Sequence, residues 1–110
     1  MDSEVKILFV DFVGFERTVK VMSYAKGLVA KGNHPIWNAI KNLDDRIETA
    51  NVENVKEFND LGIEGKVGND KVIIGNEKVM RECNIELKGD TQNKIFFAIN
   101  FQVQAVFKLG

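Results

Sequence analysis

The first residue that could recognise a ligand is His34, the only histidine in the chain, which precedes Pro35. Proline is favoured at the first helical position because its missing N–H would be unpaired there, so a helix is predicted to begin at Pro35 with His34 as its N-cap. Histidine is not a favoured cap. Its flat ring carries a donor and an acceptor, and it suits stacking on a purine or hydrogen bonding to one. The structural alternative is a helix start whose cap happens to be histidine.

Glycines form the second feature, in the run GIEGKVG from Gly62 to Gly68 and again at Gly75, which Asn76 follows. Glycine lets a backbone approach a ligand closely, but it also simply makes turns and bulges. Gly68 is interpreted as part of a hairpin turn. The spacing does not match the dinucleotide-binding fingerprint, which needs a preceding strand and a following long helix.

Catalytic and metal-binding signatures are missing from the sequence. There is no nucleophile elbow, no Cys-His signature and no Walker phosphate loop. Asp44 and Asp45 are interpreted as a solvated surface pair. The lone Cys83 excludes an intramolecular disulfide and is predicted to lie half-buried on a short helix. We therefore predict no catalytic residue and no metal ligand.

Composition bounds the class of protein. A chain of 110 residues is expected to form one domain. A formal net charge of -1 gives no electrostatic footprint for nucleic acid or for an anionic membrane surface. The start of the chain lacks the pattern of a signal peptide, and its apolar stretches are too short to span a bilayer.

Three helices are predicted from apolar spacing and capping signals. The first runs from residue 16 to about residue 30, and the second begins at Pro35. The third is a short helix from Glu77 to about Cys83, which Asn76 can cap. On the first helix the apolar positions are Val19, Met22, Ala25, Leu28 and Val29, and the outer positions are Glu16, Lys20 and Lys26.

Strands are predicted at residues 5–13, at about 52–58, and in a hairpin of 63–67 and 71–74 joined by Gly68-Asn69-Asp70. Odd-numbered apolar residues from Ile95 to Leu109 predict two more strands with a turn near 100–102. Four aromatic residues are assigned to the core: Phe96, Phe97, Phe101 and Phe107. The expected fold is α+β, a mainly antiparallel sheet of about six strands with a helical pair and a short helix packed on it.

Taken in order, the segments NHPIWNAI, LGIEGKV, VIIGNEKVM and AVFKLG resemble the ATP-binding (N) domain of heavy-metal P-type ATPases, including the copper exporters. The resemblance covers essentially the whole chain. It implies that residues 1–110 are a single N domain excised from a longer membrane ATPase.

The resemblance also implies roles for individual residues. His34 matches the histidine that contacts adenine. Gly62 matches the second glycine of a Gly-x-Gly turn, Ile63 the apolar residue after it, and Gly75 with Asn76 the Gly-Asn that closes the pocket. The chain departs from the family at three positions: Asp60 stands at the first glycine, Val29 at a glutamate, and Asn33 at an acidic residue.

The implied function is to bind ATP and present its γ-phosphate to the phosphorylation domain of a metal-translocating ATPase, with copper as the expected cargo. The isolated domain is expected to be monomeric and to have no activity of its own. Its partners would be the phosphorylation and actuator domains of the same chain, with Mg²⁺ held mainly by the former. The protein would then be the cytoplasmic part of an integral membrane protein.

Two other interpretations remain. One is a degenerate N domain that does not bind ATP and serves as an interaction or regulatory surface, which Asp60 and Val29 favour. The other is a small nucleotide-binding protein that is complete in itself.

Overall fold

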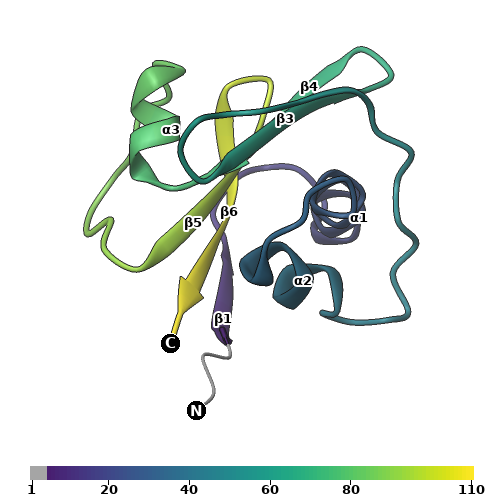
Figure 1. The fold of residues 1–110 in the computed structure, drawn as a ribbon, viewed down its shortest axis with the longest axis horizontal. Coiled ribbons are helices and arrows are strands. Elements are labelled where there is room, and N and C mark those ends of the chain that lie inside the picture. Colours follow the sequence, from purple (N-terminus) through teal and green to yellow (C-terminus); the bar gives the residue numbers. More distant parts are fainter. Residues whose placement is uncertain (1–4) are drawn as a thin grey trace.

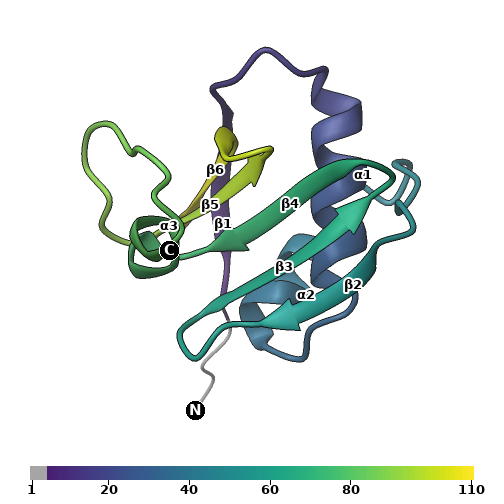
Figure 2. The same cartoon turned by 90° about the horizontal axis from the view of Figure 1, so that it is seen from above.

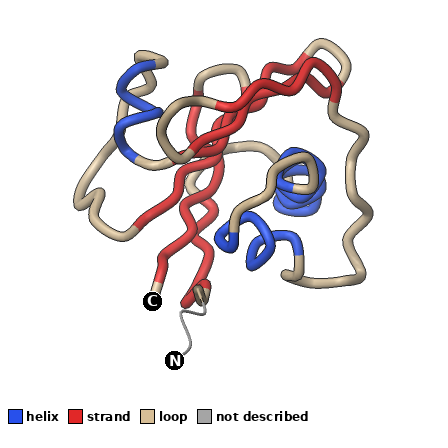
Figure 3. Tube along the Cα trace, in the orientation of Figure 1, coloured by secondary structure: helices blue, strands red, loops and turns tan. Residues whose placement is uncertain are grey.

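One six-stranded antiparallel sheet forms the centre of the protein, and the computed structural model describes residues 5–110 (Figures 1 and 3). The strand order is β1-β6-β5-β4-β3-β2. The strands are β1 (Ile7–Phe12), β2 (Glu53–Glu57), β3 (Gly62–Val67), β4 (Asp70–Gly75), β5 (Lys94–Ile99) and β6 (Gln102–Leu109). The helices are α1 (Thr18–Val29), α2 (Pro35–Lys41) and α3 (Glu77–Glu82). This arrangement confirms the predicted α+β fold.

Each face of the sheet carries its own hydrophobic core. α1 and α2 cover one face, above buried side chains such as Phe97 and Phe107. The short helix α3 covers the opposite face, where Val79 and Met80 pack on Ile73. Figures 1 and 2 show α3 on the other side of the sheet from α1 and α2. β4 contacts α1 on one face and α3 on the other, and β3 contacts α1.

Local sequence signals placed the starts of α2 and α3 correctly, whereas α1 begins at Thr18 and not at residue 16. Pro35 is the first residue of α2, and the Asn76 side chain accepts a hydrogen bond from the Val79 amide at the start of α3. The β3–β4 turn needs only Gly68 and Asn69, because Val67 already pairs with Asp70. Gly68 has a φ of 60°, a left-handed conformation that glycine adopts without steric cost.

Lys26 does not lie on the outer face of α1 as predicted. The side chain is only 3% exposed, and its Nζ donates hydrogen bonds to the carbonyl oxygens of Leu43 (2.6 Å) and Asp44 (2.8 Å). These carbonyls follow the end of α2 and need a donor once they are covered. Helical spacing alone does not reveal such a long-range partner. Val19, predicted to face the core, is instead exposed.

The alternation predicted for residues 95–109 breaks at two places. Asn100 and Phe101 form the β5–β6 turn, and the Phe101 side chain is exposed rather than part of the core. Further along, Phe97 pairs with Ala105 and Ala98 with Val103, so Gln104 is the extra residue of a bulge. The buried Gln104 side chain accepts a hydrogen bond from the Glu16 amide. The bulge therefore turns a polar residue inward to fix the chain before α1.

No helix within residues 5–110 is both long enough and apolar enough to cross a membrane.

Candidate functional site

His34 lies at the start of α2 with its backbone extended and its ring exposed. The ring Nδ1 accepts a hydrogen bond from the Ile36 amide at 3.1 Å, so the histidine acts as a helix cap. This bond occupies Nδ1 and leaves Nε2 without a partner among the described residues. The Trp37 ring lies 6.2 Å from the His34 ring at an angle of 58°. Such a tilted pair of rings holds the imidazole against a buried aromatic support.

The sequence before His34 creates the space for this pair. α1 ends at Val29, and the turn after it passes Gly32 directly over the indole of Trp37. A Cβ on Gly32 would stand 2.5 Å from a Trp37 ring carbon. Glycine at this position therefore lets the Asn33–His34 segment lie close to the indole.

A cleft of about 330 Å³ lies between this helix start and the loop that joins β2 to β3. This volume is at the lower end of the range for small-molecule sites. The loop is tightened by a 3.0 Å hydrogen bond from the Phe58 amide to the Gly62 carbonyl. The residues that line the cleft are Asn33, His34, Trp37, Glu57, Phe58, Asn59, Asp60, Leu61 and Gly62. They include aromatic rings, amides and two carboxylates, but neither lysine nor arginine.

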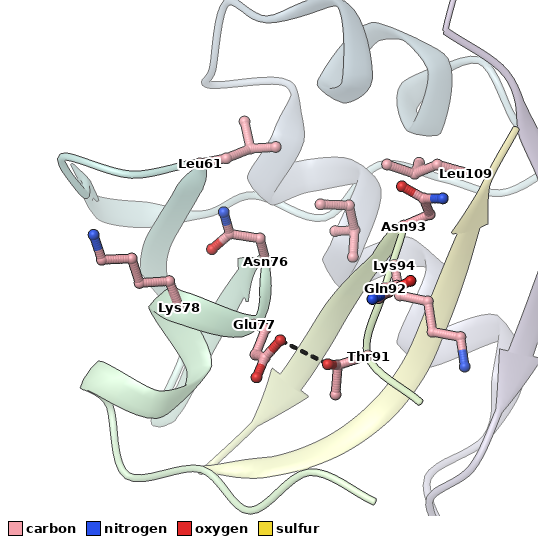
Figure 4. Close-up of a pocket in the computed structure, with 10 residues that line it drawn as sticks. Leu61, Asn76, Glu77, Lys78, Thr91, Gln92, Asn93, Lys94 and Leu109 are labelled. Atoms are coloured by element: carbon pink, nitrogen blue, oxygen red, sulfur yellow. Dashed lines mark hydrogen bonds between the residues drawn. The ribbon is translucent and has the colours of Figure 1, made fainter. Parts of the chain in front are cut away.

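Leu61 also lines a second hollow beside the cleft. Figure 4 shows the residues that line this hollow. Asn76 lines it, and the backbone N–H of Asn76 donates a hydrogen bond to the Leu61 carbonyl oxygen at 3.0 Å. Two lysines, Lys78 and Lys94, also line this hollow. The two spaces therefore differ in charge: acidic side chains line the cleft, and cationic side chains contribute to the hollow.

Polar contacts hold the wall of the second hollow in place. Thr91 donates to the Glu77 carboxylate at 2.6 Å, as Figure 4 shows, and this bond together with Arg81 lowers the pKa of Glu77. Lys78 stands 3.5 Å from Asp60, which joins α3 to the β2–β3 loop by an exposed ion pair. An exposed pair of this kind contributes little stability. Lys78 is therefore available to exchange Asp60 for another anion.

The two predicted site glycines, Gly62 and Gly75, lie opposite each other on β3 and β4. A Cβ on Gly62 would stand 2.7 Å from a methyl group of Val79, and a Cβ on Gly75 would stand 2.8 Å from the Val79 Cβ. Both glycines are thus required for α3 to pack on the sheet. Close packing of a helix explains them without any ligand.

The predicted site residues occupy three different settings. His34 and Gly62 line the cleft, and Asn76 lines the adjoining hollow. Ile63 and Gly75 line neither space, and the Ile63 side chain is fully buried beneath the cleft. Sequence reasoning did not identify Trp37, Leu61 or Lys78. Trp37 follows His34 by one helical turn, a spacing that places two side chains on the same face and would have revealed it.

These side chains are suited to binding a ligand. The cleft offers a tilted pair of aromatic rings and hydrogen-bonding groups at its rim. Within the described residues, no group of three or more His, Cys, Asp or Glu is arranged to hold a metal ion.

The same fold occurs in solved structures of heavy-metal P-type ATPases. The N-domain of HMA6, a copper-transporting P-type ATPase, superposes with a TM-score of 0.75 at 18% identity, over 98% of this chain and 100% of that one. The catalytic domain of the CPx-ATPase CopB-B, described in a study of conformational changes upon nucleotide binding, gives 0.73 at 19% identity. A zinc-transporting PIB-type ATPase in the E2.Pi state gives 0.71 at 13% identity.

Coverage differs among these structures. The chain matches over 96% of its length in both the CopB-B and the zinc-transporting structures, but spans only 37% and 19% of those chains. No protein-family model and no curated protein matches the sequence. The protein therefore has the N-domain fold of copper- and zinc-transporting P-type ATPases, at a sequence identity that shows the fold alone.

Proposed function

We propose that this chain is the nucleotide-binding domain of a heavy-metal-translocating P-type ATPase, with copper as the expected cargo, and that it binds ATP beside His34. The observation that carries the proposal is the exposed His34 ring on a cleft of the N-domain fold, supported by Trp37. A flat imidazole with a free Nε2 offers a purine both a stacking surface and a hydrogen bond.

Charge suggests how the nucleotide lies. Glu57 and Asp60 line the cleft and no lysine or arginine does, so a triphosphate inside it would meet carboxylates, with Lys78 reaching Asp60 only from outside the lining. The uncharged base is the better occupant of the cleft. The phosphates would then extend past Leu61 toward Lys78 and the adjoining hollow, or out into solvent.

The predicted site residues take different parts in this proposal. His34 contacts the adenine, the Gly62 backbone forms a wall of the cleft, and Asn76 lies beside the adenosine. Ile63 and Gly75 support this surface from below. Substitutions at these two positions would act on ligand binding through the packing of the sheet.

The γ-phosphate would be presented to a phosphorylation domain elsewhere in the parent chain, where an aspartate attacks it with the help of Mg²⁺. The contribution of the N domain is to position the nucleotide and raise its effective concentration. Modest affinity suffices, because two domains share the ligand. In this proposal residues 1–110 are a cytoplasmic part of a longer membrane ATPase, which also carries the actuator domain.

The single tryptophan provides a direct test, since Trp37 lines the cleft. ATP is expected to change its fluorescence in a saturable way, and His34→Ala is expected to weaken the apparent affinity. Lys41→Ala, an exposed change in the last turn of the same helix, is the matched control and should leave the affinity unchanged. If neither fluorescence nor calorimetry detects saturable binding to the folded protein, the proposal fails and a domain that has lost its nucleotide becomes the better account.

A further inference from the structure

The two edges of the sheet differ sharply in sequence. β2, at one edge, reads ENVKE, so charged and amide side chains dominate it. β1, at the other edge, reads ILFVDF, with Asp11 as its only charged residue. Proteins commonly protect an edge strand with lysine, other charges, proline or a covering segment, because its unpaired backbone groups are a template for another strand. β2 has this protection, and β1 lacks it apart from a bulge near Leu8.

Exposed apolar side chains gather at the same edge. Among residues 5–110, the large hydrophobic residues exposed to solvent are Leu8, Phe9, Phe12, Val13, Phe15, Val19 and Phe101. All except Phe101 fall between residues 8 and 19: on β1, in the segment just after it or, for Val19, in the first turn of α1. Single exposed apolar residues are ordinary, but a concentration of this kind on a soluble domain marks an interaction surface.

We propose that this edge binds a second copy of the chain, with the two β1 strands paired antiparallel. β1 is self-complementary in this arrangement. A pairing centred on Leu8 and Phe9 places Asp11 opposite the partner's Lys6 and Val10 opposite the partner's Ile7. Lys6 and Asp11 are the only charged residues between positions 5 and 12, and neither forms an ion pair within residues 5–110.

The faces of the two sheets also match in this pairing. Ile7, which pairs with Leu109, and Val10, which pairs with Phe107, both face the core that α1 and α2 cover. Residues three apart on a regular strand would face opposite sides, but the bulge between Ile7 and Phe9 brings these two to the same face. Val10 and the partner's Ile7 therefore meet on the same face of the joined sheet. The helices of both copies would lie on that face, and the exposed Phe12 would gain the partner's Val5 as a neighbour.

The association would stop at two chains. Each copy uses the same strand, so the interface is isologous and leaves no second β1 edge free. The remaining edges of the joined sheet are the two charged β2 strands, which resist further pairing. This inference does not depend on nucleotide binding. It differs from the monomer expected in the sequence analysis, because the resemblance does not show which edge of this sheet carries exposed apolar residues.

The test is the molar mass of the protein in solution, measured by light scattering and sedimentation equilibrium from micromolar to millimolar concentration. We expect a reversible monomer–dimer equilibrium. Phe9→Lys should weaken dimerisation by at least about tenfold, since it removes buried apolar area and places two extra cations at the interface. Phe101→Lys is the matched control: Phe9 is 49% exposed and Phe101 52%, but only Phe9 lies on β1.

A charge exchange tests the register of the two strands, and it remains valid even where the Phe9→Lys protein does not fold. Asp11→Lys should weaken the dimer several-fold, and adding Lys6→Asp to the same chain should restore it. A wild-type protein that stays monomeric at millimolar concentration would overturn the proposal, as would a dimer that Phe101→Lys weakens and Phe9→Lys does not. A dimer weakened by Asp11→Lys and not restored by the exchange would contradict the proposed pairing.

Discussion

Gly62 and Gly75 face each other across β3 and β4, and the side chain of Val79 fills the space that a Cβ on either glycine would occupy. This contact seats α3 on the sheet. Since Asn76 begins α3 and Gly62 lines the cleft, the packing of a buried valine fixes the relative position of the two spaces beside Leu61.

The first prediction concerns this contact. Gly62→Ala should lower the free energy of unfolding by about 1–3 kcal/mol, because the added methyl would stand 2.7 Å from one Val79 methyl and 2.8 Å from the other. Val79→Ala removes both of these methyl groups, so in the double variant the loss should be smaller than the sum of the two single losses. Urea unfolding of the three variants measures this coupling. Simple additivity would show that Val79 is not the obstacle.

A second prediction separates two roles of Asn76. Its side chain accepts the Val79 amide hydrogen bond, so Asn76→Ala should cost about 1 kcal/mol of stability, whereas Asn76→Asp keeps an acceptor at the cap and should cost little. If Asn76 also contacts the nucleotide, Asn76→Asp should weaken ATP binding in a protein of normal stability. Full affinity in Asn76→Asp would confine the residue to its capping role.

Phe101 is the subject of the third prediction. Its φ is 68°, a left-handed conformation that is costly for an aromatic residue, and its side chain is mostly in solvent. Phe101→Gly should therefore raise the free energy of unfolding by about 0.5–1 kcal/mol. This gain is the backbone strain that glycine relieves, less the greater entropy that glycine loses when the chain folds. Asn100→Gly is the comparison and should not stabilise, because the Asn100 side chain bonds to the Lys71 amide and to Asp70. A less stable Phe101→Gly protein would contradict this account of the turn.

The fourth prediction concerns Cys83, at the end of α3. Burial raises the pKa of the thiol, and the charge of Glu64 raises it further. Alkylation by iodoacetamide at mildly alkaline pH should thus be slower in the folded protein than in the urea-unfolded chain. A raised folded pKa also means that the stability contributed by this group is present below the unfolded pKa and is lost as pH rises through the folded value. Equal alkylation rates in the two states would contradict the raised pKa.

Much of the fold could be predicted because its signals are local. Pro35 marks the start of α2, Gly68 and Asn69 make a tight hairpin, and Asn76 caps α3; each acts on residues within one turn. Two of the errors have causes outside the local sequence. Lys26 reaches carbonyls that follow a different helix, and Gln104 turns inward through a bulge that simple alternation does not anticipate.

The candidate site was predictable only in part. His34 stands out because histidine is an unusual cap, and its exposed position on a cleft agrees with the sequence analysis. The opposite wall comes from the β2–β3 loop, and which of its side chains line the cleft depends on how that loop packs against α2. The reason for the two glycines was also ambiguous from the sequence. A missing Cβ at Gly62 or Gly75 can make room for a ligand or for a neighbouring valine.

The central claim is that ATP binds beside His34, and amide chemical-shift mapping by NMR during an ATP titration tests it most directly. We predict saturable shifts concentrated at Asn33, His34, Leu61, Gly62 and Asn76, and a marked loss of these shifts in folded His34→Ala. Saturable shifts clustered on another surface, or none at millimolar ATP in the folded wild-type protein, would contradict the account.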